Sequence, residues 1–482
     1  QKSIMPNCVL LENTKCSKIS FSICTTNNYM FFFRRLFFSY VLLLFVFACN
    51  EEDIVPQHYT VANINLNNFA GTETDQTNDT RQLIYAELAN NLTSVEYRML
   101  QNLPSLAVGA NAEIADEVLI NRYQWEADNP VFQVVWERMY QGVSNLNQVV
   151  THFSSRNYSE EGSLLVLEAR VLRAMYYFEL QLMFGNVPVF KENVNDVLTS
   201  SQTNEQLIWQ LIFEDLEAGL QLGKSSDNRN FANFWAAKAL LGKVYLYRAS
   251  KGLADEWSLA FQQFNDIINS GHFILEKNYF NLFEPNLALG IENIWYTASD
   301  RVITQKSDII RENPLSTPDS RFVTLIESSD TRKVAILEKD NTATWVFRKY
   351  NPKLVQTSII PEYIFRLADI WLFHSEILNH LSATDRSRLT GINLVRARSG
   401  QNLLDNTIEE TTFLELIQVE REKELVLEAK SLFDYRRWGL TFIKKQLPDF
   451  QIEEKHLLFP IPVAVLNDEA FAKWHLKQNK GY

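Results

Sequence analysis

Residues 168–189 read EARVLRAMYYFELQLMFGNVPV, and this stretch gives the clearest indication of the fold. Apolar residues recur in it every three or four positions, as one face of a helix requires. A second face is apolar too, so we expect a helix from Gly162 to Phe184 that is sandwiched between neighbouring helices. Gly185-Asn186 is typical of a helix end, and Pro188 prevents the helix from resuming.

Helical patterns also dominate the rest of the chain. Thr203 and Gln206 have the spacing of a capping box for a helix that runs to about Leu222, and Thr412 with Glu415 forms a second box. Strand signals are few and short, so the sequence predicts a mainly α protein. Further helices are expected over 361–379, 384–398 and 412–428, and strands over 187–190, 293–297 and 345–350.

One pair of predicted helices has the spacing of a tetratricopeptide unit. Leu241-Gly242 with Tyr245 matches the first helix of that repeat, and Ala260 with Phe264 matches the second. Small residues at these positions let two antiparallel helices approach closely, and about six extra residues separate the halves near 252–257. Stacked helical hairpins are therefore the expected architecture.

The N-terminal segment resembles a lipoprotein signal peptide. Arg34-Arg35 precedes an apolar run over 36–47, which is followed by Ala48 and Cys49. Because a membrane span needs roughly 20 apolar residues, this run is too short to cross a bilayer. We expect residues 1–29 to be an upstream extension, 30–48 to be the signal peptide and Cys49 to be lipidated, with an uncleaved anchor helix as the alternative.

Cysteine usage agrees with this interpretation. Cys8, Cys16, Cys24 and Cys49 all lie at or before the expected cleavage site, so no disulfide or cysteine metal site is predicted in the mature chain. A multiply acylated cysteine anchors stably to a membrane, whereas a single acyl chain binds only marginally. Residues 49–80 are expected to form a polar tether, whose acidic cluster at 50–53 is either a solvated spacer or an export signal.

Charge argues against nucleic acid as a partner. Removal of residues 1–48 takes away five basic residues and one acidic residue, so the formal net charge moves from −12 to −16. Such a surface repels phosphate backbones. Aromatic residues make up 12% of the chain, which is enough for a large core and for exposed platforms that bind ring-shaped ligands.

A stripe of acidic residues is the main candidate for catalysis. Glu420, Glu424 and Glu428 share one helix face, and Arg436 and Arg437 follow closely. Such residues form either an acid/base site or an ion-pair network that joins helices, and spacing alone does not distinguish the two. The sequence contains no zinc-protease, nucleophile-elbow or phosphate-loop motif, so no catalytic residue, metal site or cofactor is predicted.

Aromatic residues outside the helix faces are the candidates for ligand binding. We predict ligand contacts for Trp125, Trp257, Trp295 and Tyr296, because sugar rings pack against indole faces while their hydroxyls need polar partners. Core packing is the alternative for each of these tryptophans, and Trp295 lies in a strand that is expected to be buried. Core positions are expected for Trp235, Trp371, Trp438 and His374.

A set of short motifs follows one another along the chain, at 168–189, 231–246, 330–332, 348–350, 366–379, 393–400, 420–425, 433–439, 459–462 and 478–482. In this order they resemble the SusD/RagB family of outer-membrane nutrient-binding lipoproteins. The resemblance spans roughly residue 120 to the C-terminus, and the ordered set is specific although no single motif is. His374-Ser375 departs from it, because the family usually has Tyr-Ala there.

The resemblance implies a tetratricopeptide-like lobe, within residues 81–275, and a less regular C-terminal region, residues 276–482, with the ligand site in the irregular lobe. It implies a non-catalytic lipoprotein, palmitoylated at Cys49 and facing outward from the cell outer membrane. Such a protein captures a nutrient, most often an oligosaccharide, for a SusC-like TonB-dependent transporter. The segment 276–345 is short for the family, which leaves the ligand class open.

Two other classes remain compatible with the sequence. A secreted all-helical glycoside hydrolase would show paired acids in a cleft and measurable turnover. A helical-repeat lipoprotein that serves as a scaffold for protein partners would lack a small-molecule pocket with exposed aromatics.

Overall fold

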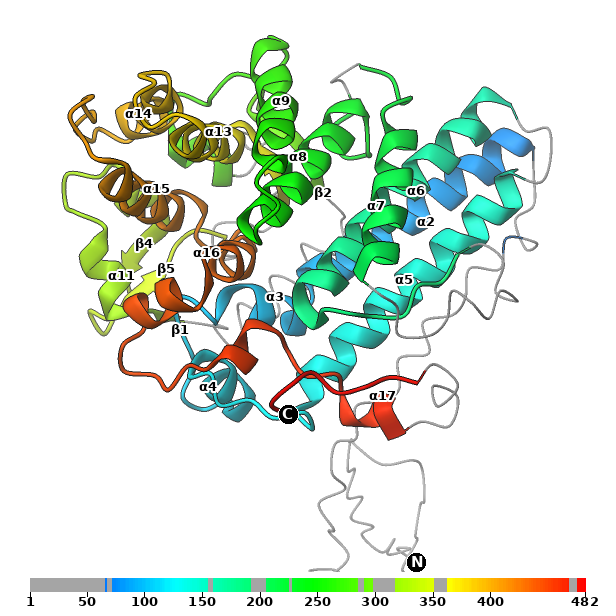
Figure 1. Ribbon diagram of the computed structural model, residues 1–482, viewed down its shortest axis with the longest axis horizontal. Coiled ribbons are helices and arrows are strands. Elements are labelled where there is room, and N and C mark those ends of the chain that lie inside the picture. Colours follow the sequence, from blue (N-terminus) through cyan, green and yellow to red (C-terminus); the bar gives the residue numbers. More distant parts are fainter. Residues whose placement is uncertain are drawn as a thin grey trace, which may run out of the picture. The chain divides into compact units, whose positions relative to one another are not determined.

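Helices form most of the described chain, as the apolar periodicity predicts (Figure 1). The computed structural model describes residue 66 and residues 72–154, 159–191, 205–224, 228–284, 290–297, 317–350, 362–467 and 475–482. The predicted upstream extension, signal peptide, Cys49 and acidic cluster lie outside these residues. No helix within the described ranges is both long and apolar enough to span a bilayer.

The N-terminal part of the described chain is purely helical apart from β1. The helices are α2 (Glu73–Thr93), α3 (Val95–Asn102), α4 (Ala115–Asn121), α5 (Pro130–Ser154), α6 (Glu160–Phe184), α7 (Glu205–Gly219), α8 (Phe234–Ser250) and α9 (Glu256–Asn269).

The C-terminal part mixes helices with short strands. Its helices are η3 (Tyr279–Phe283), α11 (Ser320–Leu325), α12 (Lys333–Ile336), α13 (Leu367–Leu381), α14 (Arg388–Arg398), α15 (Glu410–Leu425), α16 (Ser431–Gln446), η5 (Glu454–Leu457) and α17 (Val463–Asn467).

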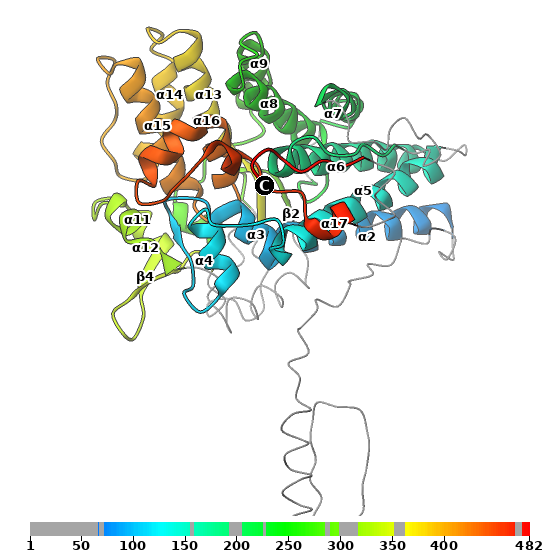
Figure 2. The same cartoon turned by 60° about the horizontal axis from the view of Figure 1, so that its bottom comes forward.

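Helix α6 confirms the prediction made from residues 168–189. It ends at Phe184, and Gly185 follows with a φ of 73°, a left-handed conformation that glycine adopts without strain. Both predicted apolar faces are covered, since α5 and α7 pack on it. The views in Figures 1 and 2 agree on this arrangement.

Glycines allow the paired helices to approach closely. A Cβ at Gly242 of α8 would lie 2.6 Å from the Phe264 ring of α9, and a Cβ at Gly142 of α5 would lie 2.5 Å from the Tyr176 ring of α6. These distances are far inside van der Waals contact, so no larger residue fits without a shift of the ring. The predicted hairpin of residues 241–264 is therefore confirmed.

Three antiparallel pairs of strands complete the described fold. β1 (Val108–Gly109) pairs with β3 (Thr317–Pro318), β2 (Asn293–Thr297) with β6 (Glu362–Arg366), and β4 (Leu337–Lys339) with β5 (Trp345–Phe347). The predicted strand at 293–297 is confirmed, and the one at 345–350 is confirmed in its first half.

Some predicted boundaries are wrong, one of them because strand pairing overrides local preference. Residues 362–366 form β6 rather than the start of a helix, because β2 pairs with them; α13 begins only at Leu367. Residues 187–190, predicted as a strand, form only an isolated bridge at Pro188. Helix α14 begins at Arg388 rather than at 384. Helix α7 ends at Gly219, and Thr203 of its predicted cap lies outside the described residues.

Two predictions about helix starts also fail. The capping box of Thr412 and Glu415 does not form, because α15 already begins at Glu410 and the Glu415 carboxylate binds Lys445 instead. Helix α2 starts inside the predicted tether, where Thr72 and Asp75 form a capping box.

Most apolar side chains belong to one extended core, with a smaller cluster among α13, α14 and α15. Trp235 is buried as predicted, whereas Trp371 and Trp438 are half-buried against the core. His374 is buried beside the Phe261 ring, with 5.0 Å between ring centroids. Burial lowers the pKa of His374 to about 4, so this histidine is a neutral core residue at neutral pH, as predicted.

Candidate functional site

The predicted aromatic contacts do not form one site in this structure. Trp125 is only 1% exposed, and its ring packs edge-on against Phe459, with 5.2 Å between centroids. Its Nε1 donates a hydrogen bond of 2.6 Å to the Tyr482 hydroxyl, which satisfies the indole N–H inside the protein. The structure therefore places Trp125 in the core, which is the alternative that the sequence left open.

Trp295 and Tyr296 lie next to each other on β2 but differ in exposure. Trp295 has no exposed surface and lies in the core, as its position in a buried strand indicated. Tyr296 is half-buried, and its backbone N–H donates to the Arg229 carbonyl at 3.0 Å. Of the two, only Tyr296 presents ring surface to solvent.

Trp257 is partly exposed and lies where α9 begins. Its ring stacks on that of His380 at the end of α13, with 4.2 Å between centroids and 24° between planes. Leu253 and Leu381, close to these two residues in sequence, are 47% and 43% exposed. The predicted insertion at 252–257 thus contributes an aromatic side chain to the surface near the end of a helical hairpin.

Trp345 is an accessible aromatic residue that the sequence analysis did not single out. It is half-buried on β5, directly opposite Lys339 of β4. The ammonium groups of Lys339 and Lys333 lie 5.2 Å and 5.6 Å from its ring centroid. The sequence predicts a short strand at Trp345, and this was the signal that could have drawn attention to it. The residues that lie opposite it on the neighbouring strand cannot be derived from sequence spacing.

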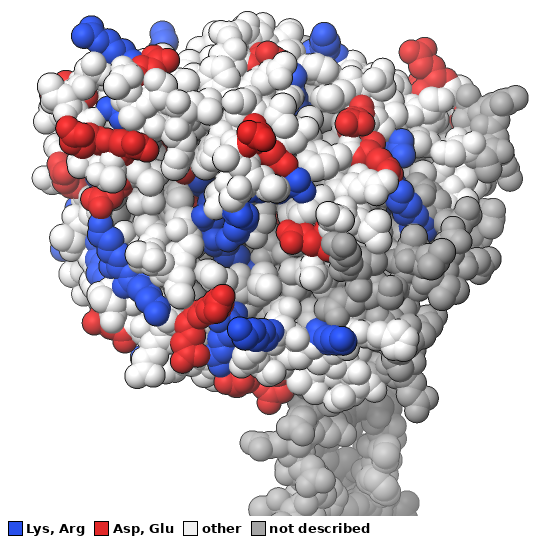
Figure 3. Space-filling view, viewed as in Figure 1, with Lys and Arg blue, Asp and Glu red and all other residues white. Residues whose placement is uncertain are grey.

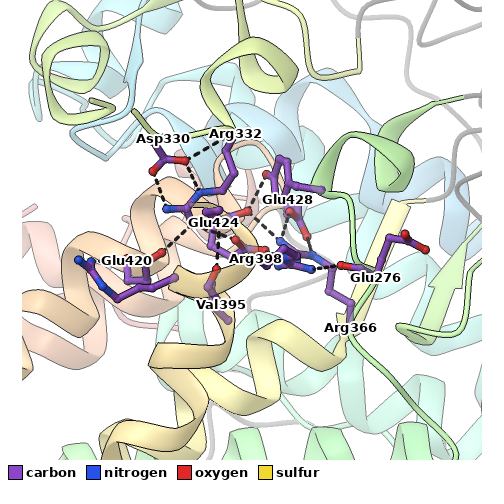
Figure 4. Close-up of polar contacts among 12 residues, drawn as sticks. Glu276, Asp330, Arg332, Arg366, Val395, Arg398, Glu420, Glu424 and Glu428 are labelled. Carbon is purple, nitrogen blue, oxygen red and sulfur yellow. Dashed lines mark hydrogen bonds and ion pairs between the residues drawn. The ribbon is translucent and has the colours of Figure 1, made fainter. Parts of the chain in front are cut away.

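The acidic stripe forms the centre of a buried ion-pair network, shown in Figure 4. Glu424 of α15 lies between the guanidinium groups of Arg332, Arg366 and Arg398. Its Oε1 is 2.6 Å from Arg366 Nη1, and its Oε2 is 2.9 Å from Arg332 Nη1. Arg398 Nη2 also bonds Oε1. Arg332 precedes α12, Arg366 ends β6 and Arg398 ends α14, so together with α15 the network joins four parts of the chain.

Glu428 joins the same network from beyond the end of α15. The helix ends at Leu425, earlier than predicted, and both Leu427 and Ala429 have positive φ angles, of 63° and 55°. This turn brings the Glu428 carboxylate within 2.8 Å of Arg366 Nη2 and 2.7 Å of Lys349 Nζ. Since non-glycine residues adopt such angles at a cost, the surrounding contacts must hold the turn in place.

Glu420 extends the network, but the two predicted arginines do not. Arg332 and Arg396 bind Glu420, at 2.7 Å and 3.0 Å. Arg437 instead pairs with Glu376 and Asp434.

Arg436 has a different role. It donates to the carbonyls of Leu182 and Met183 at the end of α6, where the partial negative charge of the helix terminus favours a cation.

The electrostatics of the network exclude it as an acid/base pair. Burial alone would raise the pKa of the Glu424 carboxyl, but the Arg398, Arg366 and Arg332 guanidiniums outweigh burial and lower this pKa. Arg366 and Lys349 lower the pKa of Glu428 against burial in the same way. Both carboxylates are therefore ionised and fully paired, and neither can donate a proton to a glycosidic oxygen at neutral pH. The ion-pair interpretation of the stripe is the one that the structure supports.

A small cavity lies beside this network. It has a volume of about 30 Å³, which is room for roughly two water molecules and not for a sugar. Glu179, Lys243, Glu428 and Lys430 contribute to its lining. Lys430 donates to the carbonyls of Tyr363 and Ile364, and burial lowers its pKa to about 8. Within the described residues, no group of His, Cys, Asp or Glu side chains has an arrangement that could hold a metal ion.

Helical hairpins, an irregular region with short strands and a fully paired ionic centre define a mainly helical protein built on a helical-repeat scaffold. The chain belongs to the SusD/RagB family: a sequence model described as "SusD family" matches residues 325–480. A second model, described as "Starch-binding associating with outer membrane", matches residues 66–246. Proteins of this family are non-catalytic and bind ligands, which sets aside the glycoside hydrolase alternative.

Individual relatives support the same assignment. The chain is 20% identical over 426 residues to the SusD-like protein P25 of Formosa agariphila, covering 72% of this chain and 79% of the relative. It resembles the crystal structure of a SusD superfamily protein from Parabacteroides distasonis with a TM-score of 0.73 and 20% identity, covering 86% and 100% of the two chains.

The name of another structural neighbour states what that protein binds. Surface glycan-binding protein A from Bacteroides uniformis matches with a TM-score of 0.69 and 18% identity, over 83% of this chain and 99% of that one. At this identity, the likeness shows that the fold is shared.

Proposed function

We propose that this protein captures a glycan at the cell surface and passes it to a TonB-dependent transporter in the outer membrane. Membership of the SusD family carries the proposal, since the model matching residues 66–246 is described as starch-binding and associated with the outer membrane. A structural neighbour described as a surface glycan-binding protein supports the same ligand class.

The half-exposed aromatic residues are the proposed contacts with sugar. Trp257 and Tyr296 keep ring surface at the exterior, whereas Trp125 and Trp295 would have to leave the core to reach a ligand. The surface charge is compatible with binding of a glycan. On the face seen in Figure 3, acidic and basic side chains form small groups that are separated by wide uncharged areas. Neutral sugar hydroxyls and C–H groups can bind such a surface through hydrogen bonds and stacking.

Membrane attachment is proposed through lipid on Cys49. A thioether-linked diacylglycerol with a palmitoyl group would hold the chain stably, because more than one acyl chain is needed for lasting attachment. Mass spectrometry of the native protein would detect the modified cysteine. A Cys49→Ser variant is expected to appear in the soluble fraction of the cells, and an unmodified Cys49 in the membrane-bound protein would contradict the proposal.

Calorimetry and affinity electrophoresis against a panel of glycans would test capture itself. We expect at least one glycan to bind the mature chain. We also expect Trp257→Ala to weaken this binding more than Trp438→Ala does, because Trp438 packs beside Phe442. Binding to a protein partner in the absence of any glycan binding would instead favour the scaffold alternative. Co-purification with a SusC-like transporter encoded next to this gene would test delivery.

A further inference from the structure

We propose that the hairpin of β4 and β5 carries a subsite for a negatively charged sugar unit, such as a uronate or a sulfated residue. This inference rests on the proposed capture of glycans and specifies the class of glycan. The residues that would form the subsite are Trp345, Lys339 and Lys333. Figure 2 shows the β4–β5 hairpin extending from the edge of the described fold, well apart from the hairpin of α8 and α9.

The register of the hairpin places the Lys339 side chain and the Trp345 ring on one face. Lys339 is paired with Trp345, and Leu337 with Phe347, so these four side chains share a face. Glu338 is paired with Val346, which places its carboxylate on the opposite face. Neither strand of the hairpin thus adds an acidic side chain to the face that Lys339 shares with Trp345.

The nearest acidic residue in the turn is occupied by the turn itself. Asp340 Oδ1 accepts hydrogen bonds from Thr342 N at 2.8 Å, Thr342 Oγ1 at 2.7 Å and Thr344 N at 2.9 Å. A carboxylate with three such donors is fixed within the turn. Asp340 therefore stabilises the hairpin and is not positioned as the counter-ion of Lys339.

Both lysines keep their charge available for a ligand. Lys333 Nζ donates to the Ile326 carbonyl at 2.7 Å, which leaves it paired with a neutral acceptor. Lys339 is exposed, and none of the described carboxylates forms an ion pair with it. Each ammonium is within about 6 Å of the Trp345 centroid, a range in which the ring attracts and orients a cation.

An anionic sugar matches this arrangement better than a neutral one. Its ring can pack on the free part of the indole, while its carboxylate or sulfate accepts charge-assisted hydrogen bonds from the ammonium groups. Because the chain carries a formal net charge of −12, it repels polyanions as a whole, so binding of a polyanion requires such a local site.

Three probes of known charge would test the subsite with the mature, full-length chain. They are polygalacturonate, dextran sulfate and uncharged dextran, the last being the backbone control for dextran sulfate. We expect the protein to bind one or both polyanions. Comparison of the affinities for polygalacturonate and dextran sulfate would show whether the subsite prefers carboxylate or sulfate. Affinity is expected to fall as NaCl is raised from about 50 mM to about 500 mM, because salt screens exposed ion pairs.

Variants would assign that binding to the hairpin. Lys339→Gln is expected to weaken polyanion binding roughly three- to fivefold, and Trp345→Ala about tenfold, from the usual strengths of exposed ion pairs and aromatic contacts. Lys224→Gln is the matched control, because Lys224 is also exposed and lies 5.0 Å from an aromatic ring, that of Phe234. Because Trp345→Ala also removes a side chain that pairs across the hairpin, Lys339→Gln provides the test that leaves the ring in place.

The two proposals fail in different ways. Binding of a neutral glycan from the wider panel, without binding of either polyanion, would overturn the anionic class and leave glycan capture standing. Polyanion binding that Lys339→Gln weakens no more than Lys224→Gln does would overturn the assignment to this hairpin. Absence of binding to every glycan would overturn both proposals.

Discussion

The hairpin of α8 and α9 and the region around α15 are held together by different kinds of contact. In the hairpin, Gly242 lets the Phe264 ring pack directly on the α8 backbone, so shape complementarity joins the helices. Around α15, fully buried guanidiniums and carboxylates join elements that are distant in sequence. Apolar packing suffices for a repeated hairpin, whereas the irregular elements are fixed by directional ionic contacts.

This contrast explains how the short strands remain in place. β6 contributes only five residues, and β5 only three, which is too few for a sheet that is stable alone. Arg366 at the end of β6 and Lys349 just after β5 both bind Glu428. The network thus ties the two strands to the turn that follows α15, and it sets the base from which the β4–β5 hairpin extends.

The largest effect is expected from removing the central cation. Arg366→Met would leave Glu292, Glu424 and Glu428 without one of their partners in a region with no solvent exposure. Loss of one member of a buried ion pair typically costs about 3–5 kcal/mol. Urea unfolding of the variant is expected to show a loss of this size, and a loss below about 1 kcal/mol would mean that the network contributes little to the fold.

Glu422 is a buried carboxylate outside the network, and its pKa is shifted in the opposite direction to those of Glu424 and Glu428. Its contribution to stability should therefore change with pH in the opposite direction. Burial raises the pKa of Glu422 to about 7 from its model-compound value of 4.5, with a further increase from Asp434, against a hydrogen bond from Tyr435 and the charge of Arg421. Between these values the folded protein binds a proton that the unfolded chain has lost. The free energy of unfolding contributed by Glu422 therefore falls as pH rises from about 4.5 to 7.

Glu422→Gln removes this loss, since glutamine does not ionise. The variant is expected to be more stable than the wild type at pH 8, by up to about 3 kcal/mol, and little changed at pH 5. Thermal unfolding measured across this range would show the difference. Equal effects at both pH values would indicate that folding does not raise the pKa of Glu422.

The stability of the α8–α9 hairpin should depend on side-chain volume rather than on charge. Gly242→Ala places a methyl group against Phe264, an overpacking cost of about 1–3 kcal/mol, offset by about 1 kcal/mol of improved helix propensity. A net destabilisation of about 1 kcal/mol is expected in chemical unfolding. Gly223→Ala is the control, because a Cβ at Gly223 meets nothing within 4 Å.

The Phe264→Leu change would sharpen this result. In the Gly242→Ala background, a smaller side chain at 264 makes room for the methyl group, so the double variant is expected to lose less than the sum of the single losses. Strictly additive losses would show that the close contact between Gly242 and Phe264 is not the cause.

Local features of the fold were predictable from sequence, and long-range ones were not. Helix α6 and the 241–264 hairpin were recognised because apolar spacing and small residues act between neighbours along the chain. The strand at 362–366 was mistaken for helix, since its partner β2 lies far away in sequence and no local pattern encodes the pairing.

The site residues follow the same rule. Trp125 lies outside the predicted helix faces, which suggested exposure, yet its indole N–H donates to the hydroxyl of Tyr482, 357 positions away. The acidic stripe on α15 was visible in the sequence, but its partners were assigned to the wrong arginines. Spacing on one helix shows which charges share a face and cannot show which distant side chains meet them.

The smallest effect is expected from an ion pair on the surface. Lys445 and Glu415 lie 2.5 Å apart, yet their side chains are 59% and 58% exposed. Water and salt screen such a pair, so Lys445→Gln should change the free energy of unfolding by less than about 0.5 kcal/mol, and 1 M NaCl should abolish even that difference. If Lys445→Gln destabilised the protein as much as Arg366→Met does, burial would not be the reason why the ion pairs around α15 are strong. The difference between this ionic region and the apolar α8–α9 hairpin would then need another explanation.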